Sequence, residues 1–503
     1  KHPFETVPCY NMLGTHPGSL PLLPETLYDF NNMFIDADGK SPKNEHIFTN
    51  RIFGLTTYYG SLYEDEQPEG YPKLLPTEIR KVPMSQYQWS SYALARMQEK
   101  DVTSSKYKKI KAAQERFGRA DTVSTYRVAS RQISNFAFPE YALQEIITPG
   151  PGGLTKTRVT GNLSKLKLES LDKDQLSIYS PKMEEMIKEI YSSFERGEKR
   201  ILVYSSFVTT GLGVLAKALI ARGWKEWTPT DAGDNTEDTY DMKKPYRFAR
   251  ITGEVLPDDR DIIKNHFNNT EDIQIIMISS TGTEGLNLLR GRVELIMEPF
   301  WYYERINQVI HRFYRYEGHK DLPPEQRTVR VVVFLSVVPD ISNIKEEDKT
   351  LKNDSGFLLI NQPTTDEHLW YEALKGKELN DKFMLMQVES SIDCSIHYPH
   401  LPDSVRKKIK CKTCAPTHKP LFNDNVMDDL KYPNPCKTVT ENTIRAKEIV
   451  LDDGTKYYYT YNPEPFELRI FMYDPRISGY VSMPKNHPQY LTLYNLIMDF
   501  SQS

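Results

Sequence analysis

Residues 275–316, IIMISSTGTEGLNLLRGRVELIMEPFWYYERINQVIHRFYRY, contain two short apolar runs, a small polar loop and a predicted helix with two arginines. The apolar runs Ile275–Ile278 and Val293–Met297 have the length and composition of buried strands. Between them, the loop Ser279–Gly285 is rich in Ser, Thr and Gly. A loop of this kind, leaving a buried strand, can bring its backbone N–H groups close to a phosphate.

The helix predicted after the second strand carries Gln308, Arg312 and Arg315. Because these residues recur at spacings of 4, 3 and 7, we expect them to share one helical face. Two arginines on one face suit a polyphosphate, since guanidinium donors match phosphate oxygens two at a time. The sequence therefore predicts phosphate-binding groups on both the loop and the helix.

Apolar strands and helices alternate on both sides of this stretch. We expect helices over Pro181–Phe194 and Pro257–Asn268, and strands over Arg200–Tyr204, Phe248–Ile251 and Thr328–Val338. Continuous apolar strands that alternate with helices indicate a parallel sheet covered on both faces. Residues 171–340 are therefore predicted to form a three-layer α/β domain.

Three stretches of this domain resemble motifs of superfamily 2 helicases and nucleic-acid translocases. RILVYSSF (200–207) resembles motif IV, SSTGTEGLNL (279–288) resembles motif V, and QVIHRFYR (308–315) resembles motif VI. The likeness is greatest to the branch found in large DNA viruses. This branch includes the poxvirus early transcription factor small subunit, nucleoside triphosphatase I and African swine fever virus relatives. Motif VI usually has Gly before its first Arg, whereas this chain has His311.

The resemblance implies a RecA-like second helicase lobe that closes on ATP held by a first lobe. It implies that Arg312 and Arg315 reach the γ-phosphate as arginine fingers, with Gln308 orienting nearby. Such contacts can contribute about 10³–10⁵ in rate to phosphoryl transfer. In the same family, motif V residues couple nucleic acid to ATP, and the matching ATP-side residues here are Gly282, Glu284 and Gly285. The residues expected to contact the nucleic-acid backbone are Ser206, Ser280 and Thr281.

The phosphate loop and the Mg²⁺-binding acidic motif of the first lobe have no counterpart in the sequence. No G-x-x-x-x-G-K-[ST] occurs, and GPGGLTKT at 150–157 lacks the Gly-Lys pair. Asp366-Glu367-His368 follows motif VI and is interpreted as the acidic first turn of a helix. We therefore expect ATP and Mg²⁺ to be held mainly by a first lobe elsewhere. On this basis the chain is the C-terminal portion of a helicase, inactive alone.

Four segments are predicted. Residues 1–105 are an N-terminal segment joining the two lobes, 106–170 a basic insertion or arm, 171–340 the lobe, and 341–503 a C-terminal α+β domain. Within the first segment we expect a helix over Phe48–Tyr59, and a strand and helix over Glu78–Lys100 with Ser85 as N-cap. In the last segment we expect a helix over Thr365–Met386 and β-hairpins over residues 447–473.

The basic residues at 101–135 are interleaved with aromatic ones. Such a run is typical of a solvated helical face. The alternative is an arm that contacts phosphates, because Lys and Arg beside stacking Tyr and Phe suit single strands. The PGPGG sequence at 149–153 indicates a boundary or loop.

Charge and composition restrict the classes of function. The chain of 503 residues has 64 basic and 68 acidic side chains, so a nucleic-acid surface must be a local patch. No apolar run approaches the roughly 20 residues needed to span a bilayer. The first residue is not Met and no signal-peptide pattern follows, from which we expect a fragment of a longer polypeptide or a processed chain. We expect an intracellular location, and the host cytoplasm and virion if the protein is viral.

The five cysteines are too few for a disulfide framework in a chain of this size. Cys411-x-x-Cys414 has the spacing of metal ligands, and Cys394, Cys436 or His418 would complete a zinc site. A single C-x-x-C lacks the second pair that makes such a pattern specific. Free thiols in a loop-rich region are the other interpretation.

Three functions are compatible with these observations. The first is the C-terminal half of an ATP-dependent helicase acting in viral transcription, with DNA or RNA, single strand or duplex, as ligand. Its expected partners are the first lobe and a viral RNA polymerase or transcription factor subunit. The second is a non-catalytic scaffold of a viral transcription complex, in which Arg312 and Arg315 serve structure. A nucleotide-binding transferase is disfavoured because no early strand is followed by a Gly-rich phosphate loop.

Overall fold

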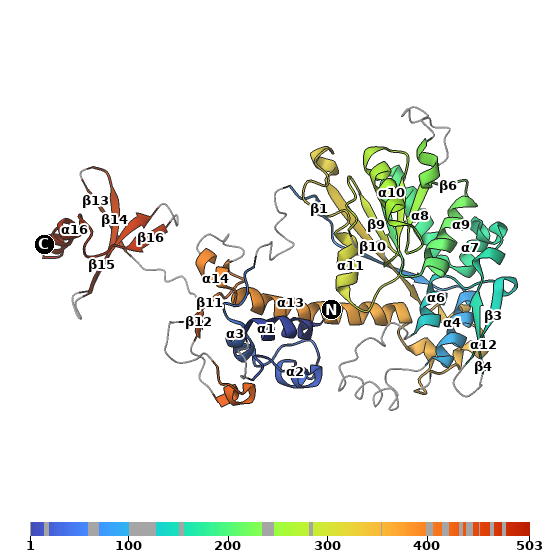
Figure 1. Ribbon diagram of the computed structural model, residues 1–503, viewed down its shortest axis with the longest axis horizontal. Coiled ribbons are helices and arrows are strands. Elements are labelled where there is room, and N and C mark those ends of the chain that lie inside the picture. The colour runs from blue at the N-terminus through green and yellow to red at the C-terminus, as the bar shows by residue number, and fades with distance from the viewer. Residues whose placement is uncertain are drawn as a thin grey trace.

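A computed structural model gives the three-dimensional structure of the protein (Figure 1). It describes residues 2–14, 20–58, 70–99, 127–149, 155–233, 246–280, 285–353, 355–398, 406–414, 422–431, 436–438, 446–451, 453–462, 467–474 and 479–502. The larger part of these residues surrounds one parallel sheet, and the remainder form a helical region and a small antiparallel sheet (Figure 1).

The main sheet has eight strands. Seven of them are paired in the order β1-β10-β9-β5-β8-β7-β6, and the eighth, β2, pairs with the C-terminal part of β10, on the same side as β1. Every pairing in it is parallel. The strands are β1 (Lys73–Leu74), β2 (Glu78–Pro83), β5 (Ile201–Tyr204), β6 (Lys225–Glu226), β7 (Arg247–Ile251), β8 (Ile275–Ile278), β9 (Val293–Ile296) and β10 (Thr328–Val337). The predicted strands over Arg200–Tyr204, Phe248–Ile251 and Thr328–Val338 are thus confirmed to within one residue at each end.

Helices cover both faces of this sheet. Leu202 and Val203, adjacent on β5, belong to different apolar clusters, because successive side chains of a strand point to opposite faces. One cluster includes residues of α7 (Lys173–Tyr179), α8 (Pro181–Glu195) and α9 (Val214–Ile220). The other includes residues of α10 (Pro257–Asn269) and α11 (Tyr303–Ile310). The predicted three-layer α/β architecture is confirmed.

The sheet also takes in strands from the predicted N-terminal segment. β2 pairs with β10 over six residues, from Glu78 to Pro83, and is followed by α4 (Gln86–Gln98). Ser85 is the N-cap of α4, and its side chain accepts a hydrogen bond from the Gln88 N–H at 3.0 Å, as predicted. The division into four segments stays a prediction, but the main sheet contains strands from both sides of the predicted boundary at residue 105.

The end of the predicted basic arm is packed inside the protein. Helix α6 (Val128–Asn135) lies against α4, and its residues Ser130, Arg131, Ser134 and Asn135 are buried. Both predictions made for the basic run, a solvated helical face and an arm that contacts phosphates, are therefore wrong for residues 127–135. Residues 101–126 lie outside the described part of the chain. Strands β3 (Leu143–Pro149) and β4 (Thr155–Gly161) pair antiparallel on either side of the PGPGG sequence, whose residues after Pro149 lie outside the described part of the chain.

The long helix α13 (Thr365–Glu389) connects the α/β lobe to a smaller helical region (Figure 1). It begins with a capping box in which the side chain of Thr364 accepts from the Glu367 N–H, and Glu367 accepts from the Thr364 N–H. The predicted acidic first turn is confirmed. Near the other end, Leu379, Phe383 and Met386 join the apolar core of three N-terminal helices. These are α1 (Val7–Gly14), α2 (Leu27–Phe34) and α3 (Glu45–Ile52).

Helix α3 begins three residues before the predicted Phe48 and ends at Ile52 rather than near Tyr59. Two residues on, Gly54 has a left-handed φ of +73°, which is incompatible with continued right-handed helix. The remaining helices of the described region are α12 (Glu346–Lys349), α14 (Ile392–His397) and α16 (Tyr490–Gln502).

The C-terminal residues form a four-stranded antiparallel sheet, confirming the predicted hairpins. Its strands β13 (Lys447–Val450), β14 (Lys456–Asn462), β15 (Glu467–Asp474) and β16 (Gly479–Ser482) pair in chain order. Leu493 and Ile497 of α16 complete its apolar core. No helix within the described ranges is long and apolar enough to span a bilayer.

Three arginines converge on one carboxylate where α8 packs on the sheet. Glu189 accepts hydrogen bonds from Arg80 of β2 and Arg330 of β10, both at 2.5 Å, and from Arg196 at 2.6 Å. Burial by itself would raise the pKa of Glu189, but the three guanidinium groups outweigh it and lower the pKa to about 2. This carboxylate therefore joins α8 to two neighbouring strands.

Replacing Glu189 with Gln should destabilise the fold by about 3 kcal/mol at neutral pH, because three clustered cations lose their shared anion. The folded-state pKa of about 2 lies below the ordinary glutamate pKa of 4.5, so the stabilisation is complete above pH 4.5 and is lost as pH falls towards 2. Urea unfolding of both proteins across this range would measure it. Glu185→Gln is the matched control, since Glu185 lies on the same helix, more exposed, 3.7 Å from Arg80. If the difference in unfolding free energy between the wild type and Glu189→Gln stayed the same as pH fell from 4.5 towards 2, the expectation would be contradicted.

Candidate nucleotide and nucleic-acid site

The predicted site residues lie at one edge of the parallel sheet. Strands β5, β8 and β9 all run the same way, so the residues that follow them meet at the carboxyl edge. These residues are Ser205 and Ser206 after β5, Ser279 and Ser280 after β8, and Glu298 after β9. Ligands of open α/β sheets bind outside this edge. The fold therefore brings the residues of motifs IV and V together, as the sequence predicts.

The helix that was predicted to carry the motif VI arginines is shorter than expected. α11 ends at Ile310, and His311 is its C-cap, with φ −73° and ψ 7°. Arg312 therefore lies on the turn that follows and Arg315 just beyond that turn, and the prediction that they share one helical face with Gln308 is wrong. The helix ends at this point because Phe313, the residue after Arg312, is fully buried beside Gly291. A Cβ at Gly291 would lie 2.1 Å from the Phe313 ring.

Arg312 is held against the end of the motif V loop. Its Nε donates to the Gln308 carbonyl and its Nη1 to the Leu286 carbonyl, both at 2.9 Å. Leu286 directly follows Gly285, so the guanidinium lies beside the loop although the helix has already ended. Only 9% of Arg312 is exposed, whereas Gln308 is an exposed residue. Gln308 thus contributes a backbone carbonyl to this geometry.

Arg315 is more accessible than Arg312. Its Nε donates to the His311 carbonyl at 2.7 Å, and its side chain is partly exposed. Among the described residues, neither Arg312 nor Arg315 forms an ion pair with a carboxylate. Both positive charges are thus uncompensated by the described part of the chain, which is the condition that an incoming phosphate requires.

A buried glutamate lies next to this turn. Glu294 of β9 is fully buried and accepts a hydrogen bond from the Phe313 N–H at 3.3 Å. Burial raises the pKa of Glu294 well above its usual range, although that N–H and the charge of Arg312 act in the opposite direction. Burial thus acts against the charged form of this carboxyl, while the neighbouring charge of Arg312 acts in favour of it. Sequence reasoning did not identify Glu294, which stands in an otherwise apolar strand.

The motif V loop is described only at its two ends. Ser280 and Gly285 are exposed, and Gly285 has a left-handed φ of +74°. The Ser279 N–H donates to the Ile251 carbonyl at 3.3 Å, which continues the pairing of β8 with β7. The predicted site residues Thr281, Gly282 and Glu284 lie outside the described residues, so their roles stay predictions.

The residues of motif IV surround a second buried carboxylate. Glu298 accepts hydrogen bonds from the Ser205 hydroxyl at 2.8 Å, the Ser206 N–H at 2.5 Å and the Asn135 side-chain amide at 2.8 Å. Burial raises the pKa of Glu298, and the charge of Lys182 is the largest opposing influence. Ser206 keeps a partly exposed hydroxyl, 3.2 Å from the hydroxyl of Tyr204. This network fixes the backbone at which motif IV leaves β5.

Sequence reasoning also missed the arginine of α6 that lies beside this network. The guanidinium of Arg131 lies over the ring of Phe207 at 4.9 Å and over that of Phe300 at 5.6 Å. Such stacking stabilises a guanidinium that has been removed from water.

Glycine at 211 is required because a Cβ there would lie 2.2 Å from the Ser205 hydroxyl oxygen. A bulky residue at 211 would therefore displace the motif IV serine.

The acidic residues at the start of α13 do not form a Mg²⁺ site. Asp366 is fully buried and accepts hydrogen bonds from the Lys182 ammonium and the Ser336 N–H, both at 2.9 Å. Its charge is thus compensated by lysine, which agrees with the interpretation of this sequence as a helix start. Within the described ranges, no group of three or more His, Cys, Asp or Glu residues could hold a metal ion.

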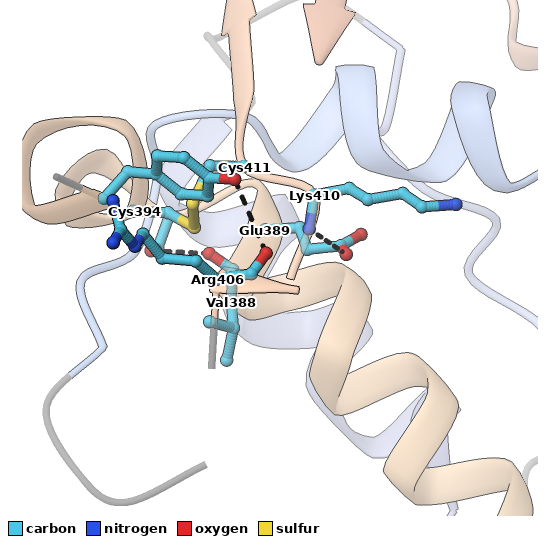
Figure 2. The surroundings of a disulfide bond; sticks show 8 residues. Val388, Glu389, Cys394, Arg406, Lys410 and Cys411 are labelled. Atoms are coloured by element: carbon cyan, nitrogen blue, oxygen red, sulfur yellow. Dashed lines mark hydrogen bonds between the residues drawn. A yellow bond between two sulfur atoms is a disulfide. The ribbon is translucent and has the colours of Figure 1, made fainter. Parts of the chain in front are cut away.

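Two of the cysteines considered for a zinc site are bonded to each other. Cys394 lies on α14, and Cys411 immediately precedes β11 (Lys412–Cys414), which pairs antiparallel with β12 (Cys436–Thr438). Cys394 and Cys411 are joined by a disulfide with a Cα–Cα distance of 5.4 Å, as Figure 2 shows, so the prediction of free thiols is wrong for these two. The Lys410 N–H also donates to Glu389 at 2.8 Å, so the backbone next to Cys411 is fixed to the end of α13 (Figure 2).

Comparison with known proteins places this arrangement in a family. The family described as Helicase conserved C-terminal domain matches residues 217–317, which include the motif V loop and both arginines. The crystal structure of the C-terminal part of the Fun30 ATPase domain is similar over 62% of this chain and 99% of that one, at 13% identity and a TM-score of 0.31.

Viral proteins are similar over most of the chain. The termination factor NPH-I homologue of African swine fever virus (isolate Tick/South Africa/Pretoriuskop Pr4/1996) is 30% identical, over 98% of this chain and 69% of that protein. The putative ATP-dependent RNA helicase R350 of Acanthamoeba polyphaga mimivirus is 23% identical over 86% of this chain and 57% of its own length. The chain therefore belongs to the superfamily 2 helicases of large DNA viruses, the family that includes the African swine fever virus NPH-I homologues.

Proposed function

We propose that this chain supplies the second lobe of an ATP-dependent nucleic-acid translocase, with Arg312 and Arg315 as its arginine fingers. The observation that carries the proposal is the position of Arg312, which donates to the Leu286 carbonyl at the end of the motif V loop. Arg315 lies one turn further on, without a carboxylate partner in the described residues. Two adjacent guanidinium groups beside a phosphate-binding loop suit the charge that develops during phosphoryl transfer.

ATP with Mg²⁺ is the cofactor that this proposal requires. When bound, Mg²⁺ neutralises charge on the β- and γ-phosphates. The described residues supply cationic groups but no cluster of metal ligands, and this pattern fits a lobe that faces a Mg²⁺-ATP held from the opposite side. In this arrangement Arg312, already fixed by two backbone carbonyls, positions the γ-phosphate, and the more accessible Arg315 contacts it as the lobes close.

Nucleic acid is proposed to bind at the same edge of the sheet. Ser206 and Ser280 follow adjacent strands and both are accessible, so their polar groups can contact consecutive phosphates of one strand. Thr281 belongs to the same proposed contact surface. One viral relative is named a termination factor NPH-I homologue, and another similar protein is an early transcription factor large subunit homologue of African swine fever virus, 28% identical over 183 residues. We therefore propose viral transcription, inside the infected cell, as the setting, with an RNA polymerase or factor subunit as partner.

One feature favours a second function, that of a non-catalytic scaffold. Arg312 is a buried residue whose guanidinium donates to two backbone carbonyls, as a purely structural arginine would. The partly exposed Arg315 distinguishes the two functions, since a scaffold does not need it.

The proposal is tested by the ATPase activity of a polypeptide that contains both lobes, measured with single- and double-stranded DNA and RNA. We expect hydrolysis that at least one of these nucleic acids stimulates about tenfold or more, because closure of the second lobe completes the site. The chain described above, assayed alone, is the control. Folded two-lobe protein without ATPase activity in any condition would instead support the scaffold.

A further inference from the structure

Motif VI departs from its usual sequence at His311, and this side chain begins a row of aromatic rings. The rings of His311 and Tyr314 meet edge to face, with their centroids 5.7 Å apart. The ring of Tyr71 lies 5.3 Å from that of Tyr314 and 5.9 Å from that of Tyr316. These separations are typical of aromatic pairs that attract each other. The four rings therefore form one continuous group, which we call the aromatic row.

The aromatic row adjoins the arginine that the proposed function assigns to the γ-phosphate. Arg315 lies between Tyr314 and Tyr316 in the sequence, and its Nε donates to the His311 carbonyl at 2.7 Å. Phe313 of the same stretch is fully buried, whereas Tyr316 is 63% exposed. A contiguous group of apolar side chains that reaches the surface is typical of a binding site. The row is therefore not explained by the core alone.

The backbone fixes Tyr316 where a ligand can reach it. The Cδ2–Cε2 edge of its ring lies against Gly70, where a Cβ would come within 2.6 Å of Cε2. Gly70 has a left-handed φ of +85°, and its carbonyl accepts a hydrogen bond from the Glu317 N–H at 2.8 Å. Glu317 itself has a φ of +51°, which a residue other than glycine seldom adopts. A ring that is held in place before the ligand arrives loses less conformational entropy on binding.

The charges beside the row suit a phosphorylated ligand. Glu317, the carboxylate next to Tyr316, is paired with Lys320 at 3.6 Å. Arg315 forms no ion pair with a carboxylate in the described part of the chain. A cation beside aromatic rings is the combination that binds nucleotides, because the cation takes the phosphate and a ring stacks on the base. Stacking uses the face of the base, so it does not distinguish one base from another.

The base could belong to ATP or to the nucleic acid, and the position of the row favours ATP. The Arg290 N–H donates to the Gly318 carbonyl at 2.9 Å, and Arg290 precedes β9, so the turn with Tyr316 lies at the amino end of that strand. Ser206 and Ser280, the proposed nucleic-acid contacts, follow the carboxyl ends of β5 and β8. The four residues of β9 separate these two edges of the sheet by about 13 Å, at about 3.3 Å per residue.

We propose that the ring of Tyr316, supported by Tyr71, stacks on the base of the nucleoside triphosphate whose γ-phosphate Arg315 contacts. This inference rests on the function proposed above, because it assigns the other end of the same nucleotide. The base and the γ-phosphate lie at opposite ends of that molecule. Side chains that diverge from two adjacent residues, one cationic and one aromatic, suit these two ends.

The test is the affinity of the polypeptide that contains both lobes for two ligands, measured by calorimetry with Mg²⁺. One ligand is the non-hydrolysable ATP analogue AMP-PNP, and the other is inorganic tripolyphosphate, which has the charged end but no base. Tyr316→Ala should raise the Kd for AMP-PNP at least about fivefold, because it removes the stacking ring. The same variant should leave the Kd for tripolyphosphate unchanged.

Further variants make the test specific to the ring. Tyr316→Phe should restore the wild-type Kd for AMP-PNP, because phenylalanine keeps the aromatic face. Because Tyr316→Ala could disturb the turn, Tyr316→Leu provides a second variant that keeps apolar bulk without that face, and it should show the same selective loss. Tyr28→Ala is the matched control, since Tyr28 is 60% exposed on α2 and lies outside the row. It should bind both ligands as the wild type does.

The outcomes separate the base site from the function on which it rests. Wild-type affinity of Tyr316→Ala for AMP-PNP would overturn the base site and leave the arginine assignment unaffected. Equal loss of both ligands in Tyr316→Ala and Tyr316→Leu would also overturn it, because the ring would then act on the phosphate end. A wild type that binds neither ligand would refute the proposed function together with the base site. If Tyr316→Ala weakens only the binding of a labelled single-stranded oligonucleotide, measured by fluorescence anisotropy, the ring stacks on nucleic acid and the proposal is wrong.

Discussion

Replacing Arg315 with Ala in a two-lobe polypeptide should reduce ATP turnover at least about 10²-fold, with little change in stability. The reason is structural. The Arg315 Nε donates to the His311 carbonyl, but no described residue pairs with its charge, so removal of the side chain costs the lobe a single hydrogen bond. Steady-state ATPase kinetics and thermal unfolding, measured on the same preparation, would separate the two effects. We expect kcat to fall more than KM rises, because the contact strengthens in the transition state.

Two further variants make this prediction specific. Arg312→Ala should lose turnover and stability together, because it also removes the hydrogen bonds to the Gln308 and Leu286 carbonyls. Lys320→Ala is the control, an exposed cation in the same turn region that pairs with Glu317 at 3.6 Å. Its turnover should match that of the wild type. Near-normal turnover of Arg315→Ala would refute the assignment of Arg315 as an arginine finger.

The second large effect concerns the ion pair of Lys182 and Asp366, which is fully buried and 2.9 Å long. Lys182→Met should destabilise the protein by about 3–5 kcal/mol, because it leaves the Asp366 carboxylate without its cation in the interior. The Ser336 N–H, which also donates to Asp366, cannot compensate for a lost charge. Chemical unfolding monitored by circular dichroism would measure the change in the free energy of unfolding.

An exposed ion pair at the same end of α13 is the matched control. Lys81 and Glu367 are 3.2 Å apart, but 62% of the Lys81 side chain is exposed. Lys81→Ala should therefore change the free energy of unfolding by less than about 1 kcal/mol. The double variant Lys182→Met/Asp366→Leu should recover much of the stability lost in Lys182→Met, since no unpaired charge remains. If the double variant is no more stable than Lys182→Met, the loss comes from packing and not from the unpaired charge.

The parts of the fold that the sequence predicted are those with a strong local pattern. Strands β5, β8, β9 and β10 are predominantly apolar runs, and each was placed to within one or two residues. The starts of α4, α8 and α13 carry a Ser or Thr cap or an N-terminal Pro, and these signals are also local. Motifs IV, V and VI were identified from short sequences whose positions on the sheet follow from the strands beside them.

The features that were missed depend on contacts between distant residues. The end of α11 is set by the packing of Phe313 against Gly291, and the sequence of the helix itself gives no stop signal there. Glu298 is recognisable as a site residue only once Asn135, on α6, is known to donate to it. The inclusion of β2 in the sheet depends on its register with β10, which is distant in the sequence. No local period encodes any of these contacts.

Helix α13 has a mechanical consequence. Its 25 residues span about 37 Å, and its first turn is fixed to the lobe by the Lys182–Asp366 pair while its far end carries Phe383 and Met386 into the N-terminal helices. A helix fixed at one end acts as a lever arm. If the lobe rotates by about 10° as ATP is hydrolysed, the far end of such a rod moves by roughly 6 Å. Rotation of the lobe would thereby displace the N-terminal helices that pack on the far end of α13.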